Sequence, residues 1–169
     1  LIADDREESS PLLLAMKKEL GDNYVGAAHE QAMVQENVYG CYVEEGLGID
    51  RNNYFNAGVL LINCKAFREN RLLEKFIELL GIYNFVVTQD EDYLNVLCKD
   101  KVLWVEQQWN TEMFGEIPYP EEEYKLIHYI MVSKPWHYAD CRCGAFFWEY
   151  AKQTFAYKEI KEVLENYTD

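Results

Sequence analysis

The stretch YFNAGVLLIN, residues 54–63, decides the fold that this chain can adopt. An apolar run, Val59 to Ile62, follows the small Ala57-Gly58 step and the amide Asn56. A short apolar run bounded by turn residues predicts a strand that is buried on both faces. Because Gly58 has no Cβ, a backbone or a ligand can approach closely there, and the Asn56 amide can both donate to and accept from a polyhydroxyl ligand. Two interpretations stay open: a core strand with a tight lead-in, or the wall of a sugar site.

Strands and helices alternate on both sides of this stretch. Further strands are expected at 24–28, 101–105 and 126–130, and helices at 12–20, 66–80, from 88 onward, 144–153 and 157–167. Residues 31–53 show no clear period, and such a long excursion is unusual in a compact domain. The alternation predicts one α/β domain over residues 1–169, with a mainly parallel sheet.

The composition limits the partners of the chain. A formal net charge of −14 argues against nucleic acid as the main partner, and a phosphate-bearing ligand would need a local Lys or a bound cation. Thirteen Tyr and four Trp can fill a core or line a sugar-binding surface. No apolar run approaches the roughly 20 residues of a transmembrane segment. Five Cys, an odd number, suit reduced thiols in the cytosol better than a disulfide framework.

Three consecutive acids, Asp90, Glu91 and Asp92, stand at a predicted helix start. Thr88 and Glu91 have the spacing of a capping box, and acids in a first turn stabilise the helix dipole. The alternative is that one or two of these carboxylates face a ligand, where they bond hydroxyl groups or stabilise positive charge.

His128 lies in an apolar strand, six residues before Lys134. A histidine there can be an ordinary core side chain, or a neutral imidazole that binds a divalent metal. The Lys134 ammonium can hold a phosphate as a compact point charge. Cys141-x-Cys143 with His137 nearby could seed a zinc site, although no second ligand pair follows at the usual spacing.

Four blocks, in this order, resemble glycosyltransferase family 8, which includes glycogenin and bacterial lipopolysaccharide galactosyl- and glucosyltransferases. The blocks are LGDNYVGAA (20–28), YFNAGVLLIN (54–63), QDEDYLN (89–95) with the following Trp109-Asn110 pair, and IHY to KPW (127–136). The resemblance implies a GT-A fold, with a mixed sheet flanked by helices. It implies retaining transfer of a hexose from a UDP-sugar, UDP-glucose or UDP-galactose, to a saccharide or glycoconjugate acceptor, with Mn²⁺ or Mg²⁺ as cofactor. The implied setting is bacterial lipopolysaccharide biosynthesis in the cytoplasm, with a position peripheral to the membrane as an alternative.

The resemblance also assigns roles to residues of this chain. By motif position they are His128 and Asp4 as metal ligands, Lys134 at the diphosphate, Glu30, Asn56, Ala57, Gly58 and Asp90 at the sugar, and Asp90 with Glu91 as catalytic carboxylates. Glu91 falls where many relatives have Gln. A carboxylate there could stabilise an oxocarbenium-like state or act as a nucleophile.

Two residues depart from the family pattern. Ile2 stands where the first Asp of the Asp-x-Asp metal motif belongs, so Asp4, or Asp5 after a shift of register, would have to serve. Met131 stands between the His and the Lys, where relatives often place Gly, and its side chain could crowd the diphosphate. Because the sequence begins at the metal motif, we expect it to be the C-terminal portion of a GT-A domain. A catalytically inactive or truncated member that acts as a binding or scaffold module is the alternative function, and an unrelated α/β domain with chance matches is a third hypothesis.

Overall fold

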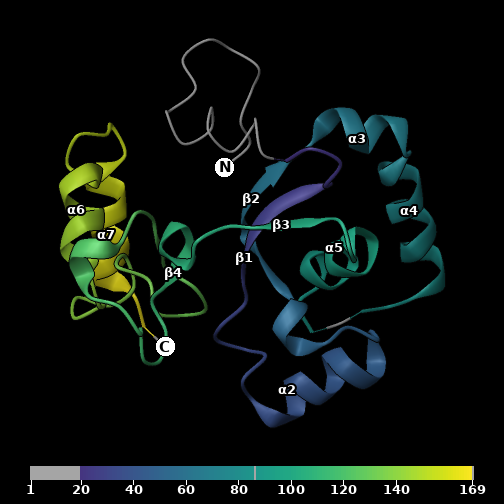
Figure 1. The fold of residues 1–169 in the computed structure, drawn as a ribbon. Coiled ribbons are helices and arrows are strands. Elements are labelled where there is room, and N and C mark those ends of the chain that lie inside the picture. Colours follow the sequence, from purple (N-terminus) through teal and green to yellow (C-terminus); the bar gives the residue numbers. More distant parts are fainter. Residues whose placement is uncertain (1–19, 86, 169) are drawn as a thin grey trace. The chain divides into compact units, whose positions relative to one another are not determined.

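The computed structural model describes residues 20–85 and 87–168, and the chain divides into two compact units, Leu1–Gln107 and Gln108–Asp169 (Figure 1). Most of the predicted helix 12–20 lies outside the described residues, as does the Asp4-Asp5 pair. The expectation of a single domain stays a prediction. Among the described residues, no helix is both long and apolar enough to cross a bilayer.

A three-stranded sheet forms the centre of the first unit. β1 (Val25–His29) lies between β2 (Phe55–Ile62) and β3 (Val102–Trp104). β1 and β3 are parallel, with Val25 opposite Val102, whereas β1 and β2 are antiparallel. The mainly parallel sheet predicted from the alternation is therefore wrong, and the mixed sheet implied by the resemblance is confirmed. The reason is the 31–53 excursion, which returns the chain beside β1 in the opposite direction.

β2 is an edge strand of the described sheet, and its second half is only partly covered. Phe55 is fully buried and belongs to a core cluster with Val25, Ala27 and Cys98. Ile62 is 38% exposed, so the prediction that Val59 to Ile62 are buried on both faces is wrong. An edge strand has a neighbour on one side only, which leaves its side chains more accessible.

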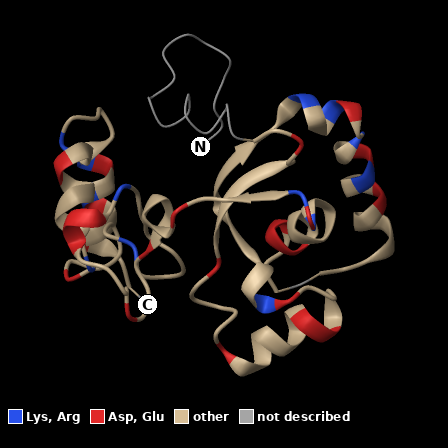
Figure 2. Cartoon of the chain, in the orientation of Figure 1, with Lys and Arg blue, Asp and Glu red and all other residues tan. Residues whose placement is uncertain are grey.

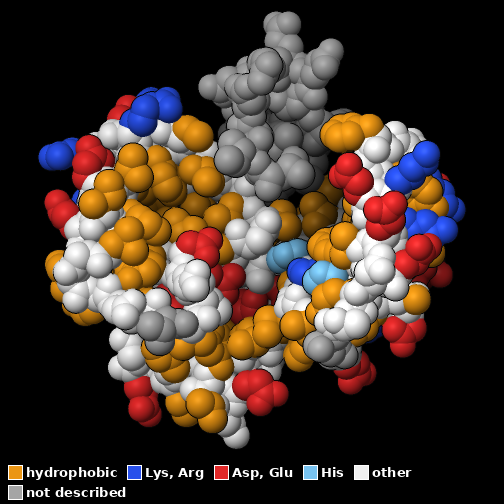
Figure 3. Space-filling view, turned by 180° about the vertical axis from the view of Figure 1, so that it is seen from behind, with side chains coloured by type: hydrophobic (Ala, Val, Ile, Leu, Met, Phe, Trp, Pro, Cys, Tyr) orange, Lys and Arg blue, Asp and Glu red, His pale blue; other side chains and the backbone are white. Residues whose placement is uncertain are grey.

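The predicted helix 66–80 is in fact two helices, α3 (Cys64–Glu69) and α4 (Leu72–Ile82). They are separated at Arg71, which has a left-handed φ of 54°. Leu72 is buried, but the next residue, Leu73, is 67% exposed. Hydrophobic side chains of this kind are visible on the surface (Figure 3). α5 (Asp90–Cys98) follows and packs against α4 and β2.

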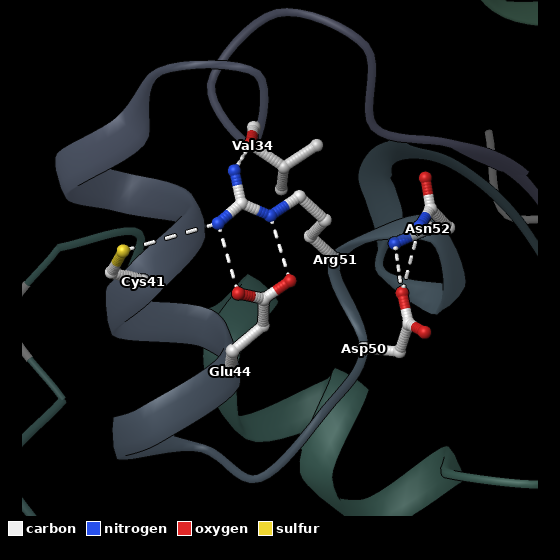
Figure 4. Close-up of polar contacts among 6 residues, drawn as sticks. All are labelled: Val34, Cys41, Glu44, Asp50, Arg51 and Asn52. Atoms are coloured by element: carbon white, nitrogen blue, oxygen red, sulfur yellow. Dashed lines mark hydrogen bonds and ion pairs between the residues drawn. The ribbon is translucent and has the colours of Figure 1, made fainter.

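The excursion 31–53 is ordered into short helices that the sequence pattern did not predict. They are α2 (Asn37–Cys41), a π-helical turn (Tyr42–Gly46) and a 3₁₀ turn (Arg51–Asn53). Arg51 fastens this segment, because its guanidinium donates to both Glu44 carboxylate oxygens, at 2.7 and 2.9 Å, and to the Val34 carbonyl (Figure 4). Val34 in turn lies in a second buried cluster with Tyr39, Val43, Ile49 and Tyr54.

The second unit is small and carries little sheet. β4 (Thr111–Glu112) pairs in parallel with β5 (Ile127–His128), so the predicted strand 126–130 is shorter than expected. The predicted tail helices are confirmed as α6 (Gly144–Ala151) and α7 (Tyr157–Asn166). Asp and Glu residues, coloured red, occur along elements of both units (Figure 2).

Candidate functional site

The beginning of β2 leaves the regular ladder, and this irregularity creates the candidate site in the first unit. The β1–β2 pairing steps from Ala27 opposite Leu60 to His29 opposite Phe55, so residues 56–59 bulge out of register. Bulges re-aim side chains and interrupt pairing, and they are common beside active sites. The motif that the sequence singled out, Asn56-Ala57-Gly58, is therefore the bulge itself.

Glu30 holds one side of the bulge. Its Oε2 accepts a hydrogen bond of 2.7 Å from the Asn56 side-chain nitrogen, while its Oε1 accepts from the backbone N–H groups of Ala32 and Met33. The Asn56 oxygen accepts from the Gly58 N–H at 3.0 Å. Glu30 and Asn56 are both buried. The pair predicted to contact a sugar is thus joined, and these bonds fix the orientation of both side chains.

Glu91 reaches the same bulge from α5. Its Oε2 accepts a hydrogen bond of 2.7 Å from the Ala57 N–H, and its side chain does not cap the helix, so the capping-box interpretation is wrong. Burial raises the pKa of Glu91 from 4.5 to about 8; the Ala57 bond opposes the rise and the Glu30 carboxylate adds to it. A buried acid that stays neutral near neutral pH, held against a bulge, is the kind of perturbed group that marks functional sites.

Asp90 lies apart from this cluster, although it neighbours Glu91 in sequence. It is exposed at the start of α5 and lines an apolar pocket of about 280 Å³ with Phe76 and Leu94. Gln89 just before it has a φ of 52° and a ψ of −110°, a backbone conformation that is costly outside glycine and that concentrates at functional sites. The turn at Gln89 aims Glu91 toward the bulge.

Asp92, which the sequence analysis assigned no role, anchors α5 from below the site. This fully buried carboxylate accepts hydrogen bonds from the Tyr54 hydroxyl at 2.7 Å and the Tyr42 hydroxyl at 3.0 Å. Tyr39 and Tyr54 also bond the Thr88 hydroxyl. The network connects the 31–53 excursion with the turn that positions Glu91. Its only signal in the sequence was the abundance of Tyr.

In the second unit, the ring of His128 is oriented by a hydrogen bond to Asn110. Its Nδ1 lies 2.9 Å from the Asn110 side-chain oxygen. Because an amide oxygen only accepts, Nδ1 carries the proton and Nε2 keeps its lone pair. Burial, with a smaller effect of Lys134, lowers the pKa of His128 to about 4, so the ring is neutral near pH 7. Asn110, a fully buried residue, is a positioning residue that the sequence analysis left without a role.

Lys134 is half-buried and donates to the Tyr129 carbonyl, and burial lowers its pKa. Between it and His128, Met131 has a left-handed φ of 52° and a side chain that is 53% exposed. A left-handed backbone favours glycine, which agrees with the Gly that the resemblance leads us to expect at this position. Within residues 20–85 and 87–168, no three His, Cys, Asp or Glu side chains gather as a metal site. His128 fits a metal; its expected partner Asp4 lies outside those residues.

Solved structures with the same architecture are glycosyltransferases. The chain matches the bifunctional glycosyltransferase WbbM with a TM-score of 0.75 at 20% identity, over 94% of this chain and 33% of that one. It matches the Streptococcus pneumoniae glycosyltransferase GlyE with a TM-score of 0.61 at 27% identity, over 90% and 38%. A galactosyltransferase, LgtC, solved with donor and acceptor sugar analogues, matches with a TM-score of 0.58 at 25% identity, over 95% and 58%. The fold is that of a GT-A glycosyltransferase, as the resemblance implied.

The chain belongs to glycosyl transferase family 8, whose family model matches residues 10–140. It is 32% identical to GlyE over 79% of this chain and 32% of that protein. It is 31% identical to the lipopolysaccharide 1,3-galactosyltransferase of Salmonella typhimurium over 51% of this chain and 28% of that enzyme. The chain spans about a third or less of the length of these curated relatives.

Proposed function

We propose that this chain carries the sugar-binding and metal-binding part of a retaining hexosyltransferase. The enzyme would transfer a hexose from UDP-glucose or UDP-galactose to a saccharide or glycoconjugate acceptor in the assembly of a bacterial surface polysaccharide. The observation that carries this proposal is the bulge 56–59, to which Glu30 and Glu91 attach from two different elements. Names of family members, among them lipopolysaccharide galactosyl- and glucosyltransferases, support the substrate class.

The bulge supplies binding groups for the transferred hexose. Gly58 is exposed and has no side chain, so a sugar ring can approach the backbone there. Asn56 and Glu30 hold each other in place beside this gap, where their polar side chains could bond sugar hydroxyl groups. Glu91 lies at the protonation boundary: when neutral it hydrogen-bonds a hydroxyl as an amide would, and when ionised it stabilises developing positive charge on the sugar. Asp90 would bond sugar hydroxyls only after a change in its side-chain orientation.

The diphosphate end of the donor would be held by His128 and Lys134. His128 presents Nε2 as a metal ligand, with Asp4 as the expected second ligand, and Lys134 supplies an ammonium for the phosphates. A bound Mn²⁺ or Mg²⁺ would neutralise the charge of the leaving nucleoside diphosphate. Asn110 keeps the imidazole in the tautomer that this role needs.

Calorimetric titration of UDP into the full-length natural protein, with and without Mn²⁺, tests the donor site. We expect metal-dependent binding that His128→Ala abolishes. Release of UDP from UDP-glucose or UDP-galactose then tests the chemistry, and Asp90→Asn should reduce turnover more than binding. If neither variant changes these quantities, the assignment of the site is wrong.

A catalytically inactive binding module is the second candidate function. The pKa of Glu91 near 8 and the exposed position of Asp90 on a separate apolar pocket favour it, because Glu91 is held neutral at pH 7 and Asp90 lies away from the bulge. Metal-dependent UDP binding without release of UDP from any UDP-hexose would support this module. Turnover of one such donor would exclude it.

A further inference from the structure

An aromatic cleft of about 580 Å³ lies within the second unit, outside the donor site described above. Its volume is within the ~300–1,000 Å³ typical of small-molecule pockets. Five of its eleven lining residues are aromatic: Tyr124, Tyr129, Phe146, Phe147 and Tyr150. The cleft contains only one acid, Glu121, and one base, Lys125.

The local structure explains why these rings face one space. Ile127 and Tyr129 line the cleft, and His128 between them does not. Side chains alternate across an extended strand, so the cleft lies on the side of β5 opposite to the metal-ligand candidate. On α6, Phe146 and Tyr150 are four residues apart and therefore lie one turn above the other on the same side of the helix.

Several cleft walls are fixed before any ligand binds. The Tyr129 hydroxyl donates to the Cys143 carbonyl at 2.7 Å, and its ring meets Phe147 edge to face at 6.3 Å. Lys125 lies over the Trp109 ring, 5.0 Å from its centroid. By contrast, Phe146 and Tyr150 are 40% and 71% exposed. Two accessible rings on a rigid base form a platform that can stack a ligand at little entropic cost.

We propose that this cleft is a binding site for a neutral saccharide, separate from the donor site. The inference does not depend on the proposed transferase function. Flat rings with hydroxyl tips provide an apolar face together with polar edges, which matches the C–H face and the hydroxyl rim of a pyranose. The balance of one acid and one base, in a chain of net charge −14, favours an uncharged ligand over an anionic lipid headgroup. Aliphatic side chains, which would favour an alkyl chain, are the minority in the lining.

Saturation-transfer NMR on the full-length natural protein, without donor or metal, tests this subsite. The probes are lactose and maltose, with n-octyl glucoside below its micelle concentration as the alkyl arm. We expect transfer to the disaccharide ring protons and competition between the disaccharides. Tyr150→Ala and Phe146→Ala should each raise the disaccharide Kd about fivefold or more, from the loss of one stacking partner.

Phe155→Ala is the matched control, because Phe155 is a fully exposed aromatic residue of the same unit that does not line the cleft. It should leave the disaccharide Kd unchanged. Transfer confined to the octyl chain, or equal losses in all three variants, would overturn the inference. Because no donor is present, failure of the proposed transferase function would leave disaccharide binding intact, and the two ideas fail separately.

Discussion

Replacing Glu91 by Gln tests whether the acid at the bulge is held neutral by its burial. In the folded protein Glu91 is 9% exposed and its pKa is raised from 4.5 to about 8, chiefly by desolvation. Gln is nearly isosteric, cannot ionise, and keeps an oxygen that can accept from the Ala57 N–H. The substitution therefore removes the ionisation and preserves the contact.

The magnitude follows from proton linkage. Between pH 4.5 and about 8 the folded protein keeps a proton on Glu91 that the unfolded chain has released, so the free energy of unfolding falls as pH rises through this window. At about 1.4 kcal/mol per pH unit, the loss is roughly 3 kcal/mol at pH 7 and approaches roughly 5 kcal/mol above pH 8. Below pH 4.5 both states are protonated and the loss vanishes. Glu91→Gln should match the wild type at low pH and exceed it by these amounts at higher pH.

Urea unfolding at pH 4.5, 6, 7, 8 and 9 measures this difference directly. Titrations elsewhere in the chain are common to both proteins and cancel in the comparison. Glu78→Gln on α4 is the control, since it replaces an exposed carboxylate by the same amide, and its profile should run parallel to that of the wild type. If the Glu91→Gln profile is also parallel, Glu91 ionises freely in the folded protein and the electrostatic account of the site is wrong.

Three further variants test the surroundings of the site. Tyr54→Phe removes the shortest hydrogen bond to the buried Asp92 carboxylate and should lower the free energy of unfolding by about 1–3 kcal/mol. Tyr83→Phe, at a half-exposed tyrosine, is the control in the same urea series. Equal effects of the two substitutions would contradict a stabilising role of the hydrogen bonds around Asp92. Asn110→Ala should weaken Mn²⁺ binding about 10–100-fold in a calorimetric titration, because His128 loses the partner that fixes its tautomer. Asn110→Asp keeps an acceptor oxygen for His128 and should retain Mn²⁺ binding. Loss of binding in both variants would indicate a packing defect instead. Gly40→Ala places a Cβ 2.2 Å from the Arg51 guanidinium, which would have to move away from Glu44, so this substitution should stabilise less than Gly81→Ala on α4, where a Cβ meets nothing within 4 Å. Gly81→Ala should stabilise by about 0.5–1 kcal/mol, and a larger gain at Gly40 would refute the role of Arg51.

The sequence singled out residues that the structure brings together, but it did not predict their environment. The short motif 54–63 drew attention to Asn56, Ala57 and Gly58, which lie in the β1–β2 bulge; their contact with a sugar stays a prediction. Local patterns also predicted the two tail helices, whose apolar residues repeat with helical spacing. The pattern of residues along the sequence does not determine the order of the strands in the sheet. The antiparallel return of β2, its edge position and its bulge depend on how the 31–53 excursion packs, and that segment has no period to analyse.

The two polar networks were missed for the same reason. The Asp92 carboxylate accepts hydrogen bonds from the hydroxyl groups of Tyr42 and Tyr54, which lie 50 and 38 residues away in sequence. Asn110 meets His128 across 18 residues. Neither pairing follows a helix or strand period, so each becomes visible only when the chain is folded. Local rules instead favoured the capping box at Thr88, which the structure replaces by a bond from Thr88 to Tyr54.

The neutral state of Glu91 bears on why Glu can stand where many relatives have Gln. A carboxylic acid with a pKa of about 8 presents one carbonyl oxygen and one proton donor at neutral pH, and an amide presents one carbonyl oxygen and an N–H donor in the same plane. The Ala57 N–H occupies one oxygen in either case. The burial that makes Glu91 costly to ionise therefore also makes it a chemical substitute for Gln. Any positive charge that develops on a bound sugar would lower its pKa again, so the side chain can ionise where an amide cannot. If the proposed function holds, Glu91 would bind a ground-state hexose as Gln would, and it would gain an electrostatic role only as the glycosidic bond breaks.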